Sequence, residues 1–195
     1  MNQKARTRAA ILQAVHDLAR SGTEITMPSV AKAALVSEAT AYRYFPDLVT
    51  LLLEAEEGTW PDPAEALAPV AYSSDPVERI GFATRVLMEG VLANESGVRA
   101  MIAGSIARPA CAARRPGHRF GLIDAALAPA AAALTEREPA ALARLRLDLA
   151  VVISADALFT LTDLCGLAPA DAIASAARTA RTLTEAAFRQ AAVTS

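Results

Sequence analysis

The chain has 195 residues, of which 53% are hydrophobic and 21% charged, and its formal net charge is −2. This balance excludes a disordered chain and supplies enough apolar surface for one large domain or two smaller ones. The longest run without a charged residue, 125–135, is much shorter than the roughly 20 residues of a membrane-spanning helix. We therefore expect no membrane partner.

Helical periodicity runs through the chain, and about a quarter of its residues are alanine, which favours closely packed helices. We predict an all-α protein with about nine helices. The first helix is predicted over about residues 5–20 and ends at Ser21-Gly22. Three short helices follow, ending near residues 35, 44 and 57, and their predicted N-caps are Thr26, Ser37 and Asp47. Gly58 and the Trp60–Pro63 stretch form a break after them.

In the second half of the chain, Asp75, Pro76 and Glu78 together predict a strong helix start. The helices expected from there on span about residues 76–93, 94–107, 118–134 with a kink at Pro129, 139–164 and 169–192. A basic loop over residues 108–117 separates two of them. The spacing of Cys111 and Cys165 predicts neither a disulfide nor a metal site, and we expect no cofactor. The N-terminus lacks the apolar stretch of a secretory signal, so we expect a cytoplasmic protein.

The helix predicted over 139–164 is apolar on two adjacent faces, which indicates that it is covered on more than one side. The final helix has a seam of small residues that allows close helix approach: Ile173, Ala176, Ala177, Ala180, Leu183, Ala187 and Ala191. We predict that the pair over 139–164 and 169–192 forms a four-helix interface with a second copy of the chain. The chain is then divided into an N-terminal domain, 1–57, and a ligand-binding and dimerisation domain, 58–195.

The first 50 residues contain six basic and four acidic side chains, whereas the remainder contains thirteen basic and seventeen acidic ones. A basic head on an acidic body suggests that the head meets a polyanion. The second and third helices, joined by Leu35-Val36-Ser37, have the pattern of a helix-turn-helix. Six apolar residues are expected to set the angle between them: Val30, Ala31, Ala34, Val36, Ala41 and Phe45.

This head resembles the tetracycline-repressor-like (TetR) family of bacterial transcriptional regulators. The resemblance covers roughly residues 7–55 and rests on TMPSVAKAA (26–34), on VSEATAYRYF (36–45) and on Leu51-Leu52. It implies a homodimer that places residues 38–44 of each copy in successive major grooves of double-stranded DNA. The residues it implies at the DNA are Lys4, Arg6, Arg8, Thr26, Ser29, Ser37, Glu38, Ala39, Thr40, Tyr42, Arg43 and Tyr44.

Two positions depart from the family pattern. The turn usually begins with glycine, and Leu35 stands there, so the turn is expected to be strained or built differently unless another residue takes the positive φ. The fourth helix usually has a lysine just after its cap, and Leu48 stands there, which removes one phosphate contact. Structural alternatives stay open: Tyr42 and Tyr44 as a partly buried aromatic pair, and the basic residues near the N-terminus as a solvated, disordered tail.

Polar side chains among the apolar residues of the body, together with one methionine, are candidates for an effector pocket: Arg85, Met88, Glu89, Ser105, His118, Asp156 and Thr160. Arg85 and Glu89 also have the spacing of an ion pair on a helix surface, and Met88 suits a core. The function expected is a ligand-responsive transcriptional regulator, by resemblance a repressor, that a small molecule releases from a palindromic operator. The alternative is a dimeric ligand-binding or interaction protein that has weakened or lost DNA binding. Catalysis is not expected, because no catalytic motif is present.

Overall fold

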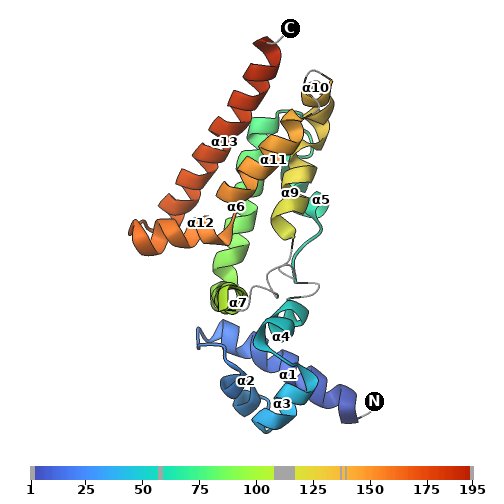
Figure 1. Ribbon diagram of the computed structural model, residues 1–195, viewed down its shortest axis with the longest axis vertical. Coiled ribbons are helices and arrows are strands. Elements are labelled where there is room, and N and C mark those ends of the chain that lie inside the picture. Colours follow the sequence, from blue (N-terminus) through green and yellow to red (C-terminus); the bar gives the residue numbers. More distant parts are fainter. Residues whose placement is uncertain (1–2, 57–58, 108–116, 137, 139, 194–195) are drawn as a thin grey trace. The chain divides into compact units, whose positions relative to one another are not determined.

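The computed structural model describes residues 3–56, 59–107, 117–136, 138 and 140–193. Every regular element in these ranges is helical, which confirms the all-α prediction (Figure 1). The helices form two compact units: unit 1 comprises Met1–Trp60 and Leu92–Pro116, and unit 2 comprises Pro61–Val91 and Gly117–Ser195. The predicted basic loop, apart from Gly117, lies outside the described residues, as does Cys111. No helix in the described part of the chain is both long and apolar enough to cross a membrane.

Unit 1 contains α1 (Gln3–Arg20), α2 (Met27–Ala33), α3 (Glu38–Tyr44), α4 (Leu48–Ala55) and α7 (Glu95–Ala107). Helix α1 packs against α2, α4 and α7, while α3 packs on α2. Large side chains fill the core of the unit: Ile11, Val15, Met27, Val30, Phe45, Leu51, Leu52 and Met101. The unit that carries the predicted helix-turn-helix therefore also includes α7, a segment that the sequence analysis assigned to the C-terminal domain.

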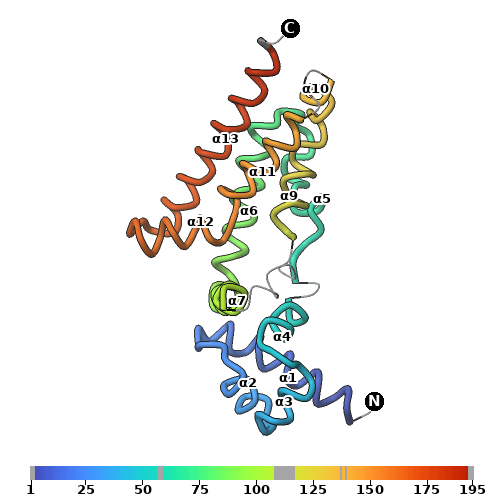
Figure 2. Tube along the Cα trace, in the orientation of Figure 1, coloured from blue at the N-terminus to red at the C-terminus, as the bar shows by residue number. Residues whose placement is uncertain are grey.

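Unit 2 contains α5 (Pro63–Ala66), the 3₁₀ turn η1 (Ala68–Val70) and α6 (Pro76–Ala93) as far as Val91. The chain continues through α9 (His118–Leu127), the 3₁₀ turn η2 (Ala128–Ala130), α10 (Ala131–Thr135) and α11 (Ala141–Val152). It ends with α12 (Ala155–Phe159), the π-helical turn η3 (Thr160–Leu164) and α13 (Pro169–Val193). Helix α11 packs against α9 on one side and α13 on another, as the trace in Figure 2 shows.

The prediction of one long helix over 139–164 is wrong. Helix α11 ends at Val152, and Ser154 has an extended backbone with φ −153°. The Ser154 hydroxyl accepts the N–H of Ala157 at 3.0 Å and donates to the carbonyl of Val151 at 2.8 Å. A serine that caps a new helix in this way competes with continuation of the old one, and the apolar pattern around it carries no sign of the break. The elements α5 and η1 were not predicted either.

The small-residue seam of α13 faces the interior of unit 2. Within the single chain, Ala176 and Ala180 are at most 2% exposed and three further members, Ile173, Ala177 and Ala191, at most 8%, so unit 2 itself covers most of this seam. Leu183 and Ala187 are half-buried. The large apolar side chains left exposed in the described part of unit 2 are Tyr72, at 80%, and Leu147, Val151 and Leu164, at 61%, 73% and 83%. Within the two predicted dimer helices, the large exposed apolar side chains therefore lie on the outer face of α11 and at the end of η3, while most of the seam is already covered.

Candidate nucleic-acid interface

The N-terminus of α2 is held by a reciprocal cap. Thr26 Oγ1 accepts the backbone N–H of Ser29 at 3.2 Å, and Ser29 Oγ accepts the backbone N–H of Thr26 at 2.9 Å. This arrangement satisfies two backbone donors that an uncapped helix leaves open. Pro28 stands in the first turn, where a missing N–H is harmless. Both polar side chains predicted to approach DNA here are therefore already engaged in fixing the start of α2.

The turn between α2 and α3 is closed by two hydrogen bonds from the backbone. The N–H of Val36 donates to the carbonyl of Ala31 at 2.9 Å, and that of Leu35 donates to Lys32 at 3.2 Å. These are the two bonds of a Schellman motif, whose geometry requires a left-handed residue at the position of Leu35. Leu35 adopts φ 56° and is 92% exposed. The turn thus keeps the geometry normally made with glycine, and leucine bears the strain.

Helix α3 begins at its predicted cap. Ser37 Oγ accepts the N–H of Thr40 at 3.2 Å and its hydroxyl lies 2.9 Å from Thr40 Oγ1. Ala41 and Phe45 are at most 1% exposed and anchor the helix in the core of unit 1. Because these two anchors share one face, Tyr42 and Arg43 between them point outward.

The outward face of α3 carries the side chains predicted to meet DNA. Glu38, Ala39 and Arg43 are exposed, and Tyr42 is 48% exposed. Thr40 and Tyr44 are half-buried, and the Arg43 guanidinium lies 5.8 Å from the centre of the Tyr44 ring. The structure brings Tyr42 and Arg43 to one surface, whereas Tyr44 also packs against the core, as the alternative interpretation of the aromatic pair expected.

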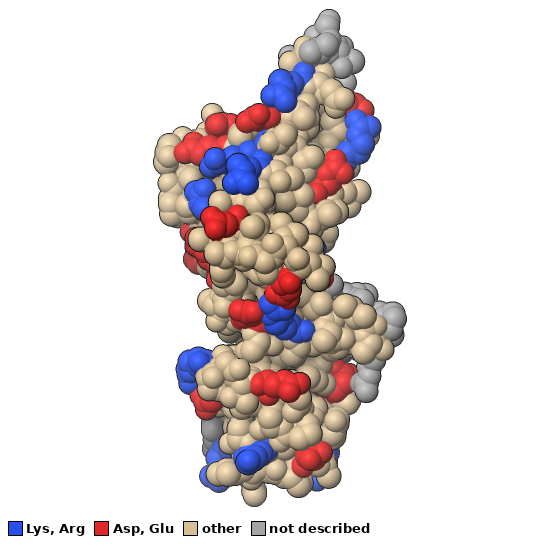
Figure 3. Space-filling model, turned by 90° about the vertical axis from the view of Figure 1, so that its left-hand side faces the viewer, with Lys and Arg blue, Asp and Glu red and all other residues tan. Residues whose placement is uncertain are grey.

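The predicted basic arm is part of a helix, because α1 already begins at Gln3. Lys4 and Arg6 are exposed on its first two turns. Arg8 is ion-paired with Glu54 of α4, and its guanidinium lies 5.2 Å from the centre of the Phe45 ring. Arg8 therefore ties α1 to α4 and to the end of α3. Basic and acidic side chains are interspersed on the face that Figure 3 shows.

The seven candidates for an effector pocket are spread over both units. Ser105 is buried on α7 in unit 1, where its hydroxyl donates to the carbonyl of Met101, and the other six belong to unit 2. Met88 is fully buried, and Glu89 is exposed. No ion pair joins Arg85 to Glu89 within the described residues; Arg85 lies over the Phe82 ring instead, at 5.4 Å.

The remaining three candidates lie near one another at the start of α9 and around α12. Asp156 is 3.7 Å from Arg119, and Thr160 donates to the carbonyl of Asp156 at 2.8 Å. Burial lowers the pKa of His118, which favours the neutral imidazole. Unit 2 has a groove between α9 and α11, and none of the seven candidates lines it.

Three ionisable side chains were not singled out from the sequence: Glu56, Asp124 and Arg146. Burial raises the pKa of the Glu56 carboxyl to about 7, with an opposing effect from the Trp60 indole. In unit 2, Asp124 of α9 forms an ion pair with Arg146 of α11. In the sequence, the pair is visible only as one acidic residue on an otherwise apolar face of the first helix and one basic residue on such a face of the second. The described residues contain no group of three His, Cys, Asp or Glu side chains that would hold a metal ion.

Comparisons add no further assignment to this geometry. No family model, no curated protein and no solved structure matches the chain.

Proposed function

We propose that the chain is a DNA-binding transcriptional regulator of the tetracycline-repressor-like type, a repressor that binds a palindromic operator as a homodimer and is released by a small molecule. The observation that supports this best is the outward face of α3, where Tyr42 and Arg43 project from a helix anchored by Ala41 and Phe45. The major groove of DNA admits a helix, arginine reads guanine, and tyrosine hydroxyls bind phosphates. A capped, rigid α3 suits this role.

A second copy has a surface to occupy. Leu147 and Val151 lie one turn apart on α11 and are both largely exposed. Exposed apolar pairs of this kind favour association with another protein surface. Two heads in a symmetric dimer would reach half-sites about 34–36 Å apart, one turn of the double helix.

The test is a mobility-shift and footprinting experiment with the DNA upstream of the protein's own gene and of its neighbours. The wild-type protein is expected to protect a palindromic site. R43A should lower the affinity about tenfold or more, as expected for the loss of a base or phosphate contact. The matched control is R20A, which removes an exposed arginine of the same unit that pairs with Asp17 on α1. Equal loss in both variants would point to a general charge effect and contradict the role of α3.

Dimerisation is tested separately by sedimentation of L147E. The glutamate is expected to convert the dimer to a monomer and to weaken operator binding without unfolding the chain, because Leu147 is exposed. A monomeric wild-type protein would remove the homodimer from the proposal. A dimer that protects no DNA would favour the alternative, a ligand-binding or interaction protein without DNA binding.

A further inference from the structure

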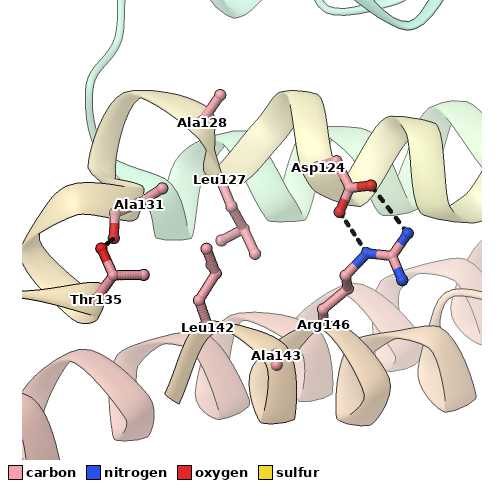
Figure 4. Close-up of a pocket in the computed structure, with 8 residues that line it drawn as sticks. All are labelled: Asp124, Leu127, Ala128, Ala131, Thr135, Leu142, Ala143 and Arg146. Carbon is pink, nitrogen blue, oxygen red and sulfur yellow. Dashed lines mark hydrogen bonds and ion pairs between the residues drawn. The ribbon is translucent and has the colours of Figure 1, made fainter. Parts of the chain in front are cut away.

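Unit 2 contains a groove between the end of α9 and the first half of α11. Its volume is about 550 Å³, within the range of small-molecule sites. Its residues come from α9, η2, α10 and α11: Asp124, Leu127, Ala128, Ala131, Thr135, Leu142, Ala143 and Arg146. In Figure 4, Leu127 and Leu142 face one another in its middle, with Thr135 towards one end and the Asp124–Arg146 pair towards the other. The groove is thus apolar with a polar group at each end.

The Asp124–Arg146 pair holds a fixed geometry. Arg146 Nε donates to Asp124 Oδ1 at 2.6 Å, and Arg146 Nη2 donates to Oδ2 at 3.0 Å. The Phe120 ring covers the guanidinium at 4.3 Å from its centre. This fork-to-fork pairing across two helices, with an aromatic ring beside the guanidinium, makes the pair a wall at this end of the groove, although the Arg146 and Asp124 side chains remain 38% and 51% exposed.

The pair still has unused hydrogen-bonding capacity. Arg146 Nη1 makes no hydrogen bond to any described residue, and each oxygen of Asp124 accepts one bond and has a second lone pair. The wall therefore offers both a donor and an acceptor. Its two charges offset one another, so an anionic ligand would meet the repulsion of Asp124 and a cationic one that of Arg146. The wall favours a neutral head group that both accepts and donates.

We propose that this groove binds a neutral, mostly apolar small molecule whose head is an amide or a hydroxyl group. The apolar body lies along Leu127, Ala131 and Leu142, and the head bonds to Arg146 and Asp124. Ligand binding at this groove does not require that the protein also binds DNA. The identification of the ligand as the effector rests on the proposed function, and the two are tested separately.

Three probes with the same alkyl chain distinguish the head groups: octanamide, octanoate and octylamine. Each is titrated into the full-length protein while the methyl resonances of Leu127, Ala131 and Leu142 are followed by NMR. Octanamide is expected to give saturable shifts of these methyls and a dissociation constant at least fivefold lower than that of octanoate or octylamine. Equal affinity for the three probes would overturn the ligand class, and methyls that do not respond to any probe would overturn the site.

Variants locate the binding. R146M keeps most of the side-chain packing and should weaken octanamide binding at least fivefold, and A143L should fill the groove and abolish binding. The matched control is R144M, on the same helix, which removes an exposed arginine that pairs with Glu138 and does not line the groove. If R144M and R146M weaken binding equally, the head-group contact is overturned. Should the methyls shift on dilution of the protein alone, the groove is a contact between copies and the small-molecule site is overturned.

The last experiment measures whether octanamide releases the protein from operator DNA. Octanamide that binds at the groove and leaves the operator complex intact would overturn the effector assignment while retaining the site. Absence of operator binding by the protein alone would overturn the proposed function, and the NMR titration would still decide the groove.

Discussion

Unit 1 buries much of the carboxyl group of Glu56, while unit 2 buries the guanidinium of Arg79, and the two groups have very different partners. Arg79 is 7% exposed, and its N–H groups donate to four backbone carbonyls, those of Ala126, Val70, Ser73 and Ala125, at 2.8–3.3 Å. For Glu56, burial raises the pKa of the carboxyl to about 7, although the Trp60 indole acts in the opposite direction. An arginine has five donors that can satisfy several carbonyls, whereas burial favours the neutral form of a carboxyl group when the loss of hydration outweighs the hydrogen-bond donor beside it.

The difference separates a stabilising group from a destabilising one. Arg79 joins the end of α9 to η1 and to the residues before α6, so it organises unit 2. Unit 1 carries Glu56 as well as the left-handed Leu35, and both are unfavourable for folding. The unit proposed to bind DNA thus tolerates local strain, which is common where a backbone or side chain is retained for a function other than stability.

The largest effect is expected from removal of the arginine in unit 2. R79M fills part of the same space but removes the guanidinium donors from the four carbonyls, so it should lower the free energy of unfolding by about 3 kcal/mol. Urea denaturation measures the loss, and hydrogen exchange should show that it affects the amides of α9 and α11 first. The control is R178M, an exposed arginine of α13, which should change stability little. A stable R79M would mean that the buried arginine does not hold unit 2 together.

In unit 1, replacement of Glu56 is expected to have a smaller effect and to increase stability. The carboxyl of Glu56 has a pKa of about 7 in the folded chain against an ordinary 4.5, so the folded state binds more protons between these values. The stability of the wild type should therefore fall as the pH rises from about 4.5 to about 7. E56Q removes the penalty of ionisation and should be more stable than the wild type by about 2 kcal/mol at pH 8, with little difference at pH 4.5.

Thermal denaturation of E56Q at pH 4.5 and pH 8 measures this difference. E65Q serves as the control, because Glu65 is exposed on α5. A difference between E56Q and the wild type that does not change with pH would refute the raised pKa and reduce the contrast between the units.

The smallest effect concerns the backbone of unit 1. Gly22 and Leu35 both close helices in left-handed conformations, at φ 66° and φ 56°. Glycine adopts this region without strain, whereas a leucine there costs about 1 kcal/mol, and the exposed Leu35 side chain has little packing to lose. L35G should raise the melting temperature by about 2 °C, because the relief of backbone strain exceeds the cost of the greater entropy that glycine gives to the unfolded chain. G22A should lower the melting temperature, because alanine is strained in the left-handed region. A lower melting temperature for L35G would show that the exposed side chain stabilises the turn.

Local signals allowed much of unit 1 to be predicted. Thr26, Ser37 and Asp47 cap the helices predicted for them, since a side-chain oxygen just before a helix bonds to backbone donors within three residues. The absence of glycine at position 35 likewise predicted the strain that the turn shows. The break at Ser154 was missed because serine occurs both inside and at the start of helices.

The sequence alone determined the helical class, the helix starts in the head and the face of α3 that points outward, because periodicity and capping act within a few residues. Tertiary structure decided which polar groups are buried and with what partners. Arg8 pairs with Glu54, Arg79 binds the carbonyl of Ala126 in α9, and Arg146 pairs with Asp124, over separations of 46, 47 and 22 residues. Such contacts depend on how helices pack against one another, and a charge pattern along one helix does not specify its partner on another.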